Sequence, residues 1–128
     1  MSTSNINTLH LYHLKWMEEL TFFKEQVNRY EARLEKLAKR IKSSRMKARL
    51  EQIQNKFIVQ KEVIDQLYHD IKIQEHELAE EVGKNPQRAT KRLFRHQSEM
   101  GNRMYRFNKL YRDMKKDFLS FCLNIKRA

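Results

Sequence analysis

Residues 37–50 have the sequence LAKRIKSSRMKARL, and the spacing of hydrophobic residues through this stretch decides the fold. Ile41 and Met46 each belong to a regular hydrophobic stripe, but they lie five residues apart instead of three or four. Met46 therefore comes about two positions later than the pattern requires. This shift turns the stripe by roughly 200° around a helix, because each residue adds about 100°. A straight helix would turn its second apolar face away from the first, whereas a tight helical hairpin brings the two faces together.

On each side of this break, hydrophobic residues recur in alternating steps of four and three, as in helical bundles and coiled coils. One stripe runs from Leu9 to Ile41, a second from Met46 to Leu78, and a third from Leu93 to Ile125. The polar interruptions are His13, Gln60, Gln74 and Gln97. Flanking apolar residues widen the stripes and favour helices with two neighbours each; these residues are Leu14, Met17, Ile58, Val63, Leu110 and Leu119.

Gly83, Asn85 and Pro86 mark a second break. Glycine can end a helix in the left-handed conformation, asparagine can cap the next helix, and proline fits its first turn. The sequence therefore predicts an all-α fold, an up-down-up antiparallel bundle of three long helices with coiled-coil-like packing. We expect helices at about residues 9–42, 45–82 and 86–126, in a single domain of residues 9–128 that follows a disordered or frayed N-terminus at residues 1–8.

An alternative remains for the first break, which contains neither glycine nor proline. One continuous helix of nearly eighty residues could instead assemble with copies of itself. The hairpin makes a testable prediction about register: positions in the first two helices should meet when their numbers add to about 87, and in the second and third when they add to about 170. This register predicts a buried hydrogen-bonded layer of His13, Gln74 and Gln97, and it places Gln60 beside the hydroxyl of Tyr111.

Four of the five histidines are expected at one end of the bundle, namely His10, His13, His76 and His96. Glu77, Glu80 and Glu99 are expected nearby. Imidazole and carboxylate groups are common ligands of zinc and iron, so a metal-binding or redox bundle is an alternative function. However, the sequence has no Glu-x-x-His motif, the signature of di-iron bundles, and His76 should point to solvent. We therefore favour surface histidines with one core histidine, and expect neither a metal nor another cofactor.

Motifs of catalysis and targeting are missing from the sequence. It has no glycine-rich phosphate loop, no Cys-x-x-Cys pair and no Gly-x-Ser-x-Gly motif, so we expect neither an enzyme nor a small-molecule substrate. Cys122 lies among apolar neighbours and is expected to be buried rather than nucleophilic. Residues 1–8 do not resemble a signal peptide, and no segment has the roughly eighteen apolar residues that span a bilayer. We therefore expect a cytoplasmic location without membrane insertion.

Charge is the most informative feature for function. The formal net charge is +11. Residues 1–83 carry 14 Lys or Arg against 13 Asp or Glu, whereas residues 84–128 carry 13 against 3. Nearly the whole excess therefore falls on the third predicted helix, where cations in the first turns oppose the helix dipole and do not help helix stability. A second basic concentration, at residues 33–56, should lie at the same end of the bundle as the C-terminus.

These observations favour a non-catalytic interaction protein, a scaffold or adaptor that associates with a protein partner or with itself. The third helix is predicted to bind an anionic partner, with nucleic acid, bound independently of sequence, as the first candidate. An acidic protein surface and an anionic lipid layer are the others, and charge that only keeps a slender protein soluble would leave the same pattern. The predicted contact residues are Arg88, Arg92, Arg95, Arg103, Tyr105, Arg106, Lys109, Arg112 and Lys116.

Overall fold

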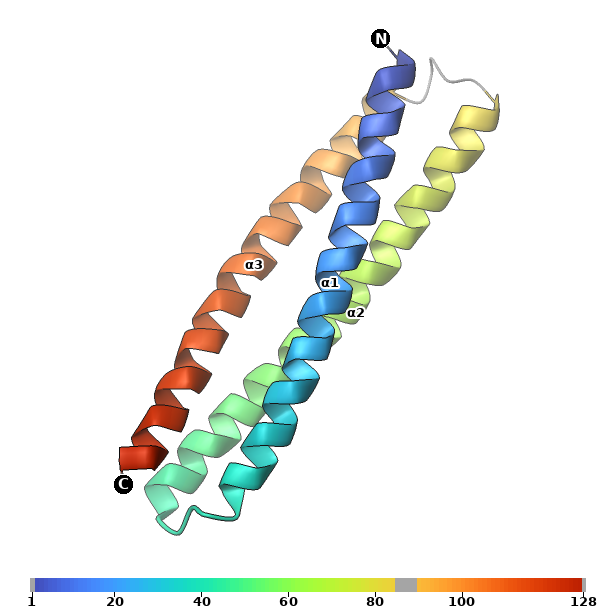
Figure 1. Ribbon diagram of the computed structural model, residues 1–128. Coiled ribbons are helices and arrows are strands. Elements are labelled where there is room, and N and C mark those ends of the chain that lie inside the picture. Colours follow the sequence, from blue (N-terminus) through green and yellow to red (C-terminus); the bar gives the residue numbers. More distant parts are fainter. Residues whose placement is uncertain (1, 85–89, 128) are drawn as a thin grey trace.

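The computed structural model describes residues 2–84 and 90–127, which form three long helices (Figure 1). Helix α1 spans Ser2–Ala38, α2 spans Ser44–Lys84 and α3 spans Thr90–Arg127. The N-terminus lies beside the end of α2 and the start of α3, and the C-terminus lies at the end that holds the turn between α1 and α2 (Figure 1). The predicted all-α, antiparallel three-helix bundle is confirmed, and the chain turns between Ala38 and Ser44 instead of continuing as one helix.

The start of α1 differs from the prediction. Residues 2–8, expected to be disordered or frayed, belong to the helix, which was predicted to begin at Leu9. Ile6 explains the difference, because it extends the first hydrophobic stripe by one step of three residues. Its buried side chain forms a small apolar cluster with Leu9, Leu78 of α2 and Leu93 of α3. Tertiary packing of this kind, more than helix propensity, stabilises the end of a helix.

The first turn uses the capping oxygen that its serines offer. The hydroxyl of Ser43 accepts a hydrogen bond from the backbone N–H of Met46 at 3.1 Å and caps the start of α2. Helix α1 ends at Ala38, before the predicted 42, because the N–H groups of Arg40 and Ile41 bond to carbonyls three residues back and tighten the chain. Ile41 lies in the turn but is only 8% exposed, so it closes this end of the core.

The second break also differs from the prediction. Helix α2 continues through Gly83 to Lys84, and no glycine within residues 2–84 or 90–127 has a left-handed backbone conformation. Glycine permits that conformation but does not impose it. The predicted capping residues Asn85 and Pro86 lie outside the described residues, and the described part of α3 begins at Thr90.

The core follows the three hydrophobic stripes. No stripe position is exposed, and every buried residue of the described ranges other than Ile6 and Cys122 lies on a stripe. Aromatic rings fill the middle of the bundle: the ring centroids of Phe57 and Phe118 are 5.3 Å apart, and those of Tyr30 and Phe118 are 4.8 Å apart. Each of the three helices contributes one of these rings, and the burial of such large apolar groups holds the helices together.

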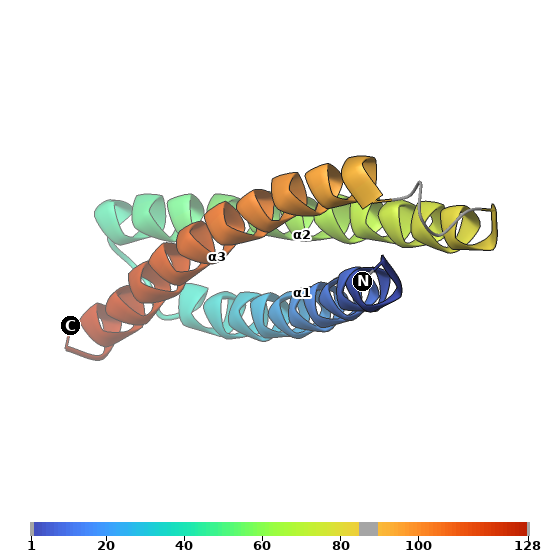
Figure 2. The same cartoon turned by 90° about the horizontal axis from the view of Figure 1, so that it is seen from above.

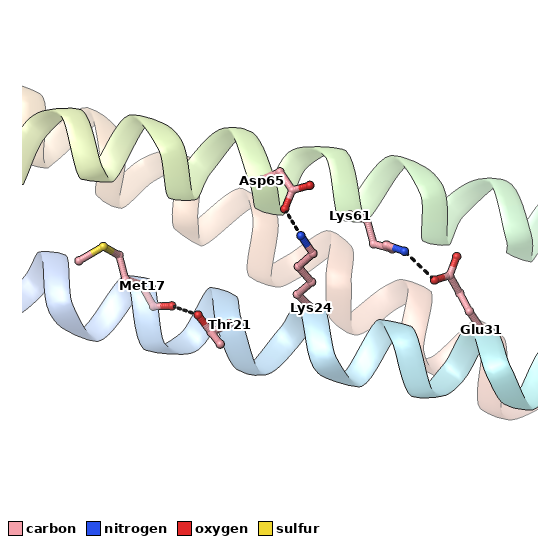
Figure 3. Close-up of polar contacts among 6 residues, drawn as sticks. All are labelled: Met17, Thr21, Lys24, Glu31, Lys61 and Asp65. Carbon is pink, nitrogen blue, oxygen red and sulfur yellow. Dashed lines mark hydrogen bonds and ion pairs between the residues drawn. The ribbon is translucent and has the colours of Figure 1, made fainter.

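Ion pairs close the seam between α1 and α2 (Figure 3). The Nζ of Lys24 lies 2.6 Å from a carboxylate oxygen of Asp65, and the Nζ of Lys61 lies 2.9 Å from one of Glu31. The paired residue numbers add to about 90, close to the predicted register. The antiparallel hairpin that the hydrophobic phase predicts is therefore joined by side chains on its surface as well as in its core.

The flanking apolar residues are less buried than predicted. Met17 and Val63 are half-buried, but four others are exposed: Leu14, Ile58, Leu110 and Leu119. Helix α3 runs obliquely to α1 and α2 (Figure 2). Residues beside the stripes therefore lie along the edges of the helix seams, where solvent reaches them.

Candidate functional site

The basic residues predicted to bind an anionic partner do not all face the same way. The guanidinium of Arg92 lies 3.6 Å from the carboxylate of Glu81 and 4.0 Å from that of Glu77, both on α2. Arg103 donates a hydrogen bond to Asp70 of α2 at 2.8 Å. These two arginines hold α3 against α2, and their charges already have partners.

Five other members of the predicted set are exposed and make no ion pair with any residue that the structure describes: Arg95, Arg106, Lys109, Arg112 and Lys116. Tyr105 is 68% exposed, as its predicted stacking role requires. Arg88 lies outside the described residues. Arg106 turns toward α2, where it lines a hollow with Val63. It is therefore separated from the cations on the other side of α3.

One side of α3 lies against α1 along a row of residues spaced by seven. At one end of this row, the Cβ position of Gly101 is 3.8 Å from the ring of Trp16. At the other end, Cys122 lies near Arg33 of α1. Lys115 belongs to the same row, because residues seven apart share one face of a helix. The next row outward contains Tyr105 and Arg112, with Lys109 and Lys116 beside them.

Helix α1 contributes cations to this side of the bundle. The positive charge of Arg29 acts on Tyr111 of α3, and those of Arg33 and Lys126 act on Cys122. Lys36 follows Arg33 by three residues and lies on the same face of α1. We call the combined surface the basic face; its cations are Arg29, Arg33, Lys36, Lys109, Arg112, Lys115, Lys116 and Lys126.

The acidic residues of α3 lie on the opposite side, toward α2. Asp117 accepts hydrogen bonds from Lys56, at 2.6 Å, and from Arg49. Asp113 and Glu99 line hollows that they share with α2 residues. On α1, Glu31 points to Lys61 of α2. Within the described residues, the basic face therefore contains cations from both α1 and α3. The acidic groups of α3 lie toward α2, where Asp117 pairs with Lys56 and Arg49.

Three of the eight cations of the basic face belong to the predicted contact set, namely Lys109, Arg112 and Lys116. The basic concentration at residues 33–56 was expected at the same end of the bundle as the C-terminus, but its residues Arg33 and Lys36 were not predicted as contacts, and Arg29 was not singled out. A signal was present: Arg29, Arg33 and Lys36 recur in steps of four and three, the same period as the hydrophobic stripe. Basic residues that recur with this period beside the hydrophobic stripe are predicted to lie along the edge of the contact between two helices.

Two buried titratable groups lie beneath the basic face. Burial raises the pKa of the Tyr111 phenol; the nearby Tyr30 raises it further, and the charge of Arg29 opposes the shift. The Tyr111 hydroxyl donates a hydrogen bond to Gln26 of α1. Burial also raises the pKa of the Cys122 thiol, against the opposing charges of Arg33 and Lys126. The thiol therefore stays protonated at neutral pH and packs as an apolar group.

The predicted histidine end contains a different arrangement from the one expected. The Nδ1–H of buried His13 donates to Glu75 at 2.5 Å, and His10 donates to the other oxygen of the same carboxylate. His76 is exposed and lies 3.2 Å from Glu80. His96 lies 3.9 Å from Glu77. Within the described ranges, no group of three or more His, Cys, Asp or Glu side chains is placed to hold a metal ion.

The predicted hydrogen-bonded layer of His13, Gln74 and Gln97 is wrong. The buried His13 bonds to Glu75 instead, and among the described residues the buried Oε1 of Gln74 has no hydrogen-bond partner. A one-residue difference in register turns a helical side chain by about 100°, which brings the stronger carboxylate acceptor to the histidine. The expected bond between Gln60 and Tyr111 is also missing, because the Tyr111 hydroxyl donates to Gln26.

In residues 2–84 and 90–127, no helix combines the length and apolarity needed to cross a membrane. The chain matches no protein-family model, no curated protein and no solved structure.

Proposed function

We propose that the protein is a non-catalytic interaction module that binds the phosphate backbone of a nucleic acid across the basic face, without reading base sequence. The observation that supports this proposal is the segregation of charge around α3. Its acidic groups lie toward α2, and four of its exposed cations lie with those of α1 in the basic face, namely Lys109, Arg112, Lys116 and Lys126. Phosphate polymers bind such surfaces by releasing condensed counterions.

Folding stability does not account for the basic face. Arg112 and Lys116 are four residues apart on α3, and like charges at this spacing destabilise a helix by about 0.2–0.5 kcal/mol. The charges of Arg33 and Lys126 act on the same thiol, so cations of the two helices also face the same region of the seam. An anionic partner would relieve both repulsions at once.

The dimensions of the face suit several consecutive phosphates. From Lys109 to Lys126 the helix rises roughly 26 Å, since each residue adds 1.5 Å. This length corresponds to about seven phosphates of one duplex strand. Tyr105 stands 68% exposed just beyond this row, where its ring can stack on an unpaired base. Backbone contacts with one stacking aromatic give affinity without sequence preference, so a single-stranded ligand suits the face best.

Salt dependence tests the proposal. Binding of a fluorescent single-stranded oligonucleotide is measured by anisotropy over a series of salt concentrations. Wild-type affinity should fall steeply with salt, with a slope of about −0.7 per phosphate contact on a log–log plot. The triple variant Arg29→Gln, Arg33→Gln, Arg112→Gln removes three of these contacts. It should bind more weakly at low salt, with a slope reduced by about 2.

A matched triple variant separates the basic face from charge in general. Lys47→Gln, Lys72→Gln, Lys91→Gln removes the same charge from exposed sites outside the face. This control should keep the wild-type slope. Equal losses in the two triple variants, or wild-type binding that is indifferent to salt, would mean that the charge only keeps the protein soluble.

A further inference from the structure

A shallow groove runs along the seam between α2 and α3, on the side away from the basic face. Its middle is apolar, lined by Val59 and Val63 of α2 and by Leu110 of α3. Val59 is 52% exposed and Leu110 is 57% exposed, although the sequence pattern predicts that Leu110 packs against a neighbouring helix. We call this surface the α2–α3 groove. Three apolar side chains side by side on a rod are a typical centre for a helix contact.

A mostly buried glutamine lies beneath the same groove. Gln60 is 8% exposed and lines the hollow that holds Val59 and Leu110. Among the residues that the structure describes, nothing hydrogen-bonds to its Oε1. Gln74, further along the seam, has an Oε1 in the same situation. Both oxygens are covered by the chain itself, and they lie at polar positions of a seam that is otherwise apolar.

The apolar centre of the groove has a positive charge on one side and a negative charge on the other, so two copies of this surface can pair opposite charges. Arg106 lies one turn before Leu110 on α3 and Asp113 lies one turn after it. Both are exposed, and neither makes an ion pair within the described residues. Their neighbours on the same side, Arg103 and Asp117, are already bound to α2. The groove therefore presents one open positive and one open negative charge, placed symmetrically about a leucine.

We propose that a second copy of this chain docks in the α2–α3 groove, related by a two-fold axis near Leu110. Such an axis runs the two α3 helices antiparallel, so that Arg106 of each copy meets Asp113 of the other and the two Leu110 side chains pack together. An isologous contact requires this reciprocity. The planar Arg106 guanidinium can donate to both carboxylate oxygens of Asp113 of the other copy.

The opposite side of the molecule explains why the copies use this groove. Two basic faces would repel each other, whereas the α2–α3 groove carries both signs of charge. The proposed dimer leaves the basic faces of both copies open on its outer sides. Dimerisation and anion binding therefore use separate residues and can fail independently.

Charge reversal tests the dimer. Analytical ultracentrifugation of the full chain between about 1 and 100 µM should show a monomer–dimer equilibrium. Arg106→Glu and Asp113→Arg should each weaken dimerisation by about tenfold or more, because each places like charges opposite one another. The double variant Arg106→Glu, Asp113→Arg restores the pair with reversed signs and should regain most of the affinity. Lys91→Glu, an equal charge change at an exposed site near the start of α3 and far from Leu110, should leave dimerisation unchanged.

A crosslink gives a second readout that does not depend on charge. With Cys122 replaced by Ala, Leu110→Cys should form a covalent dimer on mild oxidation, and Leu119→Cys, exposed on the other side of α3, should not. A wild-type chain that remains monomeric at 100 µM would overturn the proposal. So would a double variant that keeps the wild-type circular dichroism spectrum and melting temperature but does not recover dimerisation.

Discussion

The hydroxyl of Tyr111 on α3 donates a hydrogen bond to the side-chain oxygen of Gln26 on α1. This bond joins two helices that run in the same direction, and the two residues are 85 apart in sequence. The contact between Trp16 and Gly101 has the same offset. The two contacts fix the register of α1 against α3, and this register places Arg29 and Arg33 beside the cations of α3.

Removing the Tyr111 hydroxyl should therefore destabilise the fold. Tyr111→Phe keeps the buried ring but leaves Gln26 without its donor, so unfolding in urea should cost about 1 kcal/mol less free energy than for wild type. Tyr105→Phe, at a position 68% exposed, is the matched control and should change stability by less than about 0.5 kcal/mol. Equal stabilities for the two variants would mean that the bond does not contribute to the register.

Glu75 should be the most important carboxylate at the other end of the bundle. It accepts hydrogen bonds from His13, which is 3% exposed, and from His10. Glu75→Ala leaves a buried imidazole unpaired and should lower the free energy of unfolding by about 1–3 kcal/mol. Glu80→Ala removes only a contact with exposed His76 and should change stability little. Chemical denaturation at pH 7 compares the two; similar losses would contradict a specific role for Glu75.

Asp117 should make stability depend on pH in the acid range. Hydrogen bonds from Lys56, followed by those from Arg49, lower the pKa of this carboxyl below its usual value of 3.8, although partial burial opposes the shift. Because the folded pKa is the lower one, Asp117 stabilises the fold above the unfolded pKa, and this contribution disappears as pH falls through the folded value. Asp117→Asn should therefore be less stable than wild type at pH 7, with the difference vanishing at acid pH. Urea unfolding between about pH 2 and 7 tests this, and a constant difference would contradict it.

Gly101 offers a stabilising substitution. It lies inside α3, where glycine costs roughly 1 kcal/mol relative to alanine. A methyl group there would lie 3.8 Å from the ring of Trp16, an ordinary van der Waals contact. Gly101→Ala should therefore raise the melting temperature and increase the free energy of unfolding by about 1 kcal/mol. A loss of stability would mean that α1 and α3 approach more closely at this point than the structure shows.

The sequence was sufficient to predict the helices and the core. The five-residue step between Ile41 and Met46 predicted the hairpin, and the serines of the turn supplied the cap at Ser43. These features depend on local spacing, which a single chain displays directly. The start of α1 was misplaced only because the stripe was begun at Leu9 rather than at Ile6.

The candidate site was harder to predict, because it depends on register between helices that are distant in sequence. Composition located the positive charge on the third helix but not the side of that helix that carries it unpaired. Whether Arg33 of α1 meets Cys122 depends on the lengths of both turns, and small errors in these lengths accumulate. His13 shows the same sensitivity, because its partner is Glu75 and not the adjacent Gln74.

NMR mapping of the nucleic-acid contact distinguishes the basic face from every other surface of the bundle. A ¹⁵N-labelled chain is titrated with a short single-stranded oligonucleotide, and amide shifts are followed residue by residue. The largest shifts should fall in residues 26–38 of α1 and 105–126 of α3, with those of α2 nearly unchanged. Shifts concentrated on α2, or no shifts at any concentration, would contradict a binding surface formed by α1 and α3.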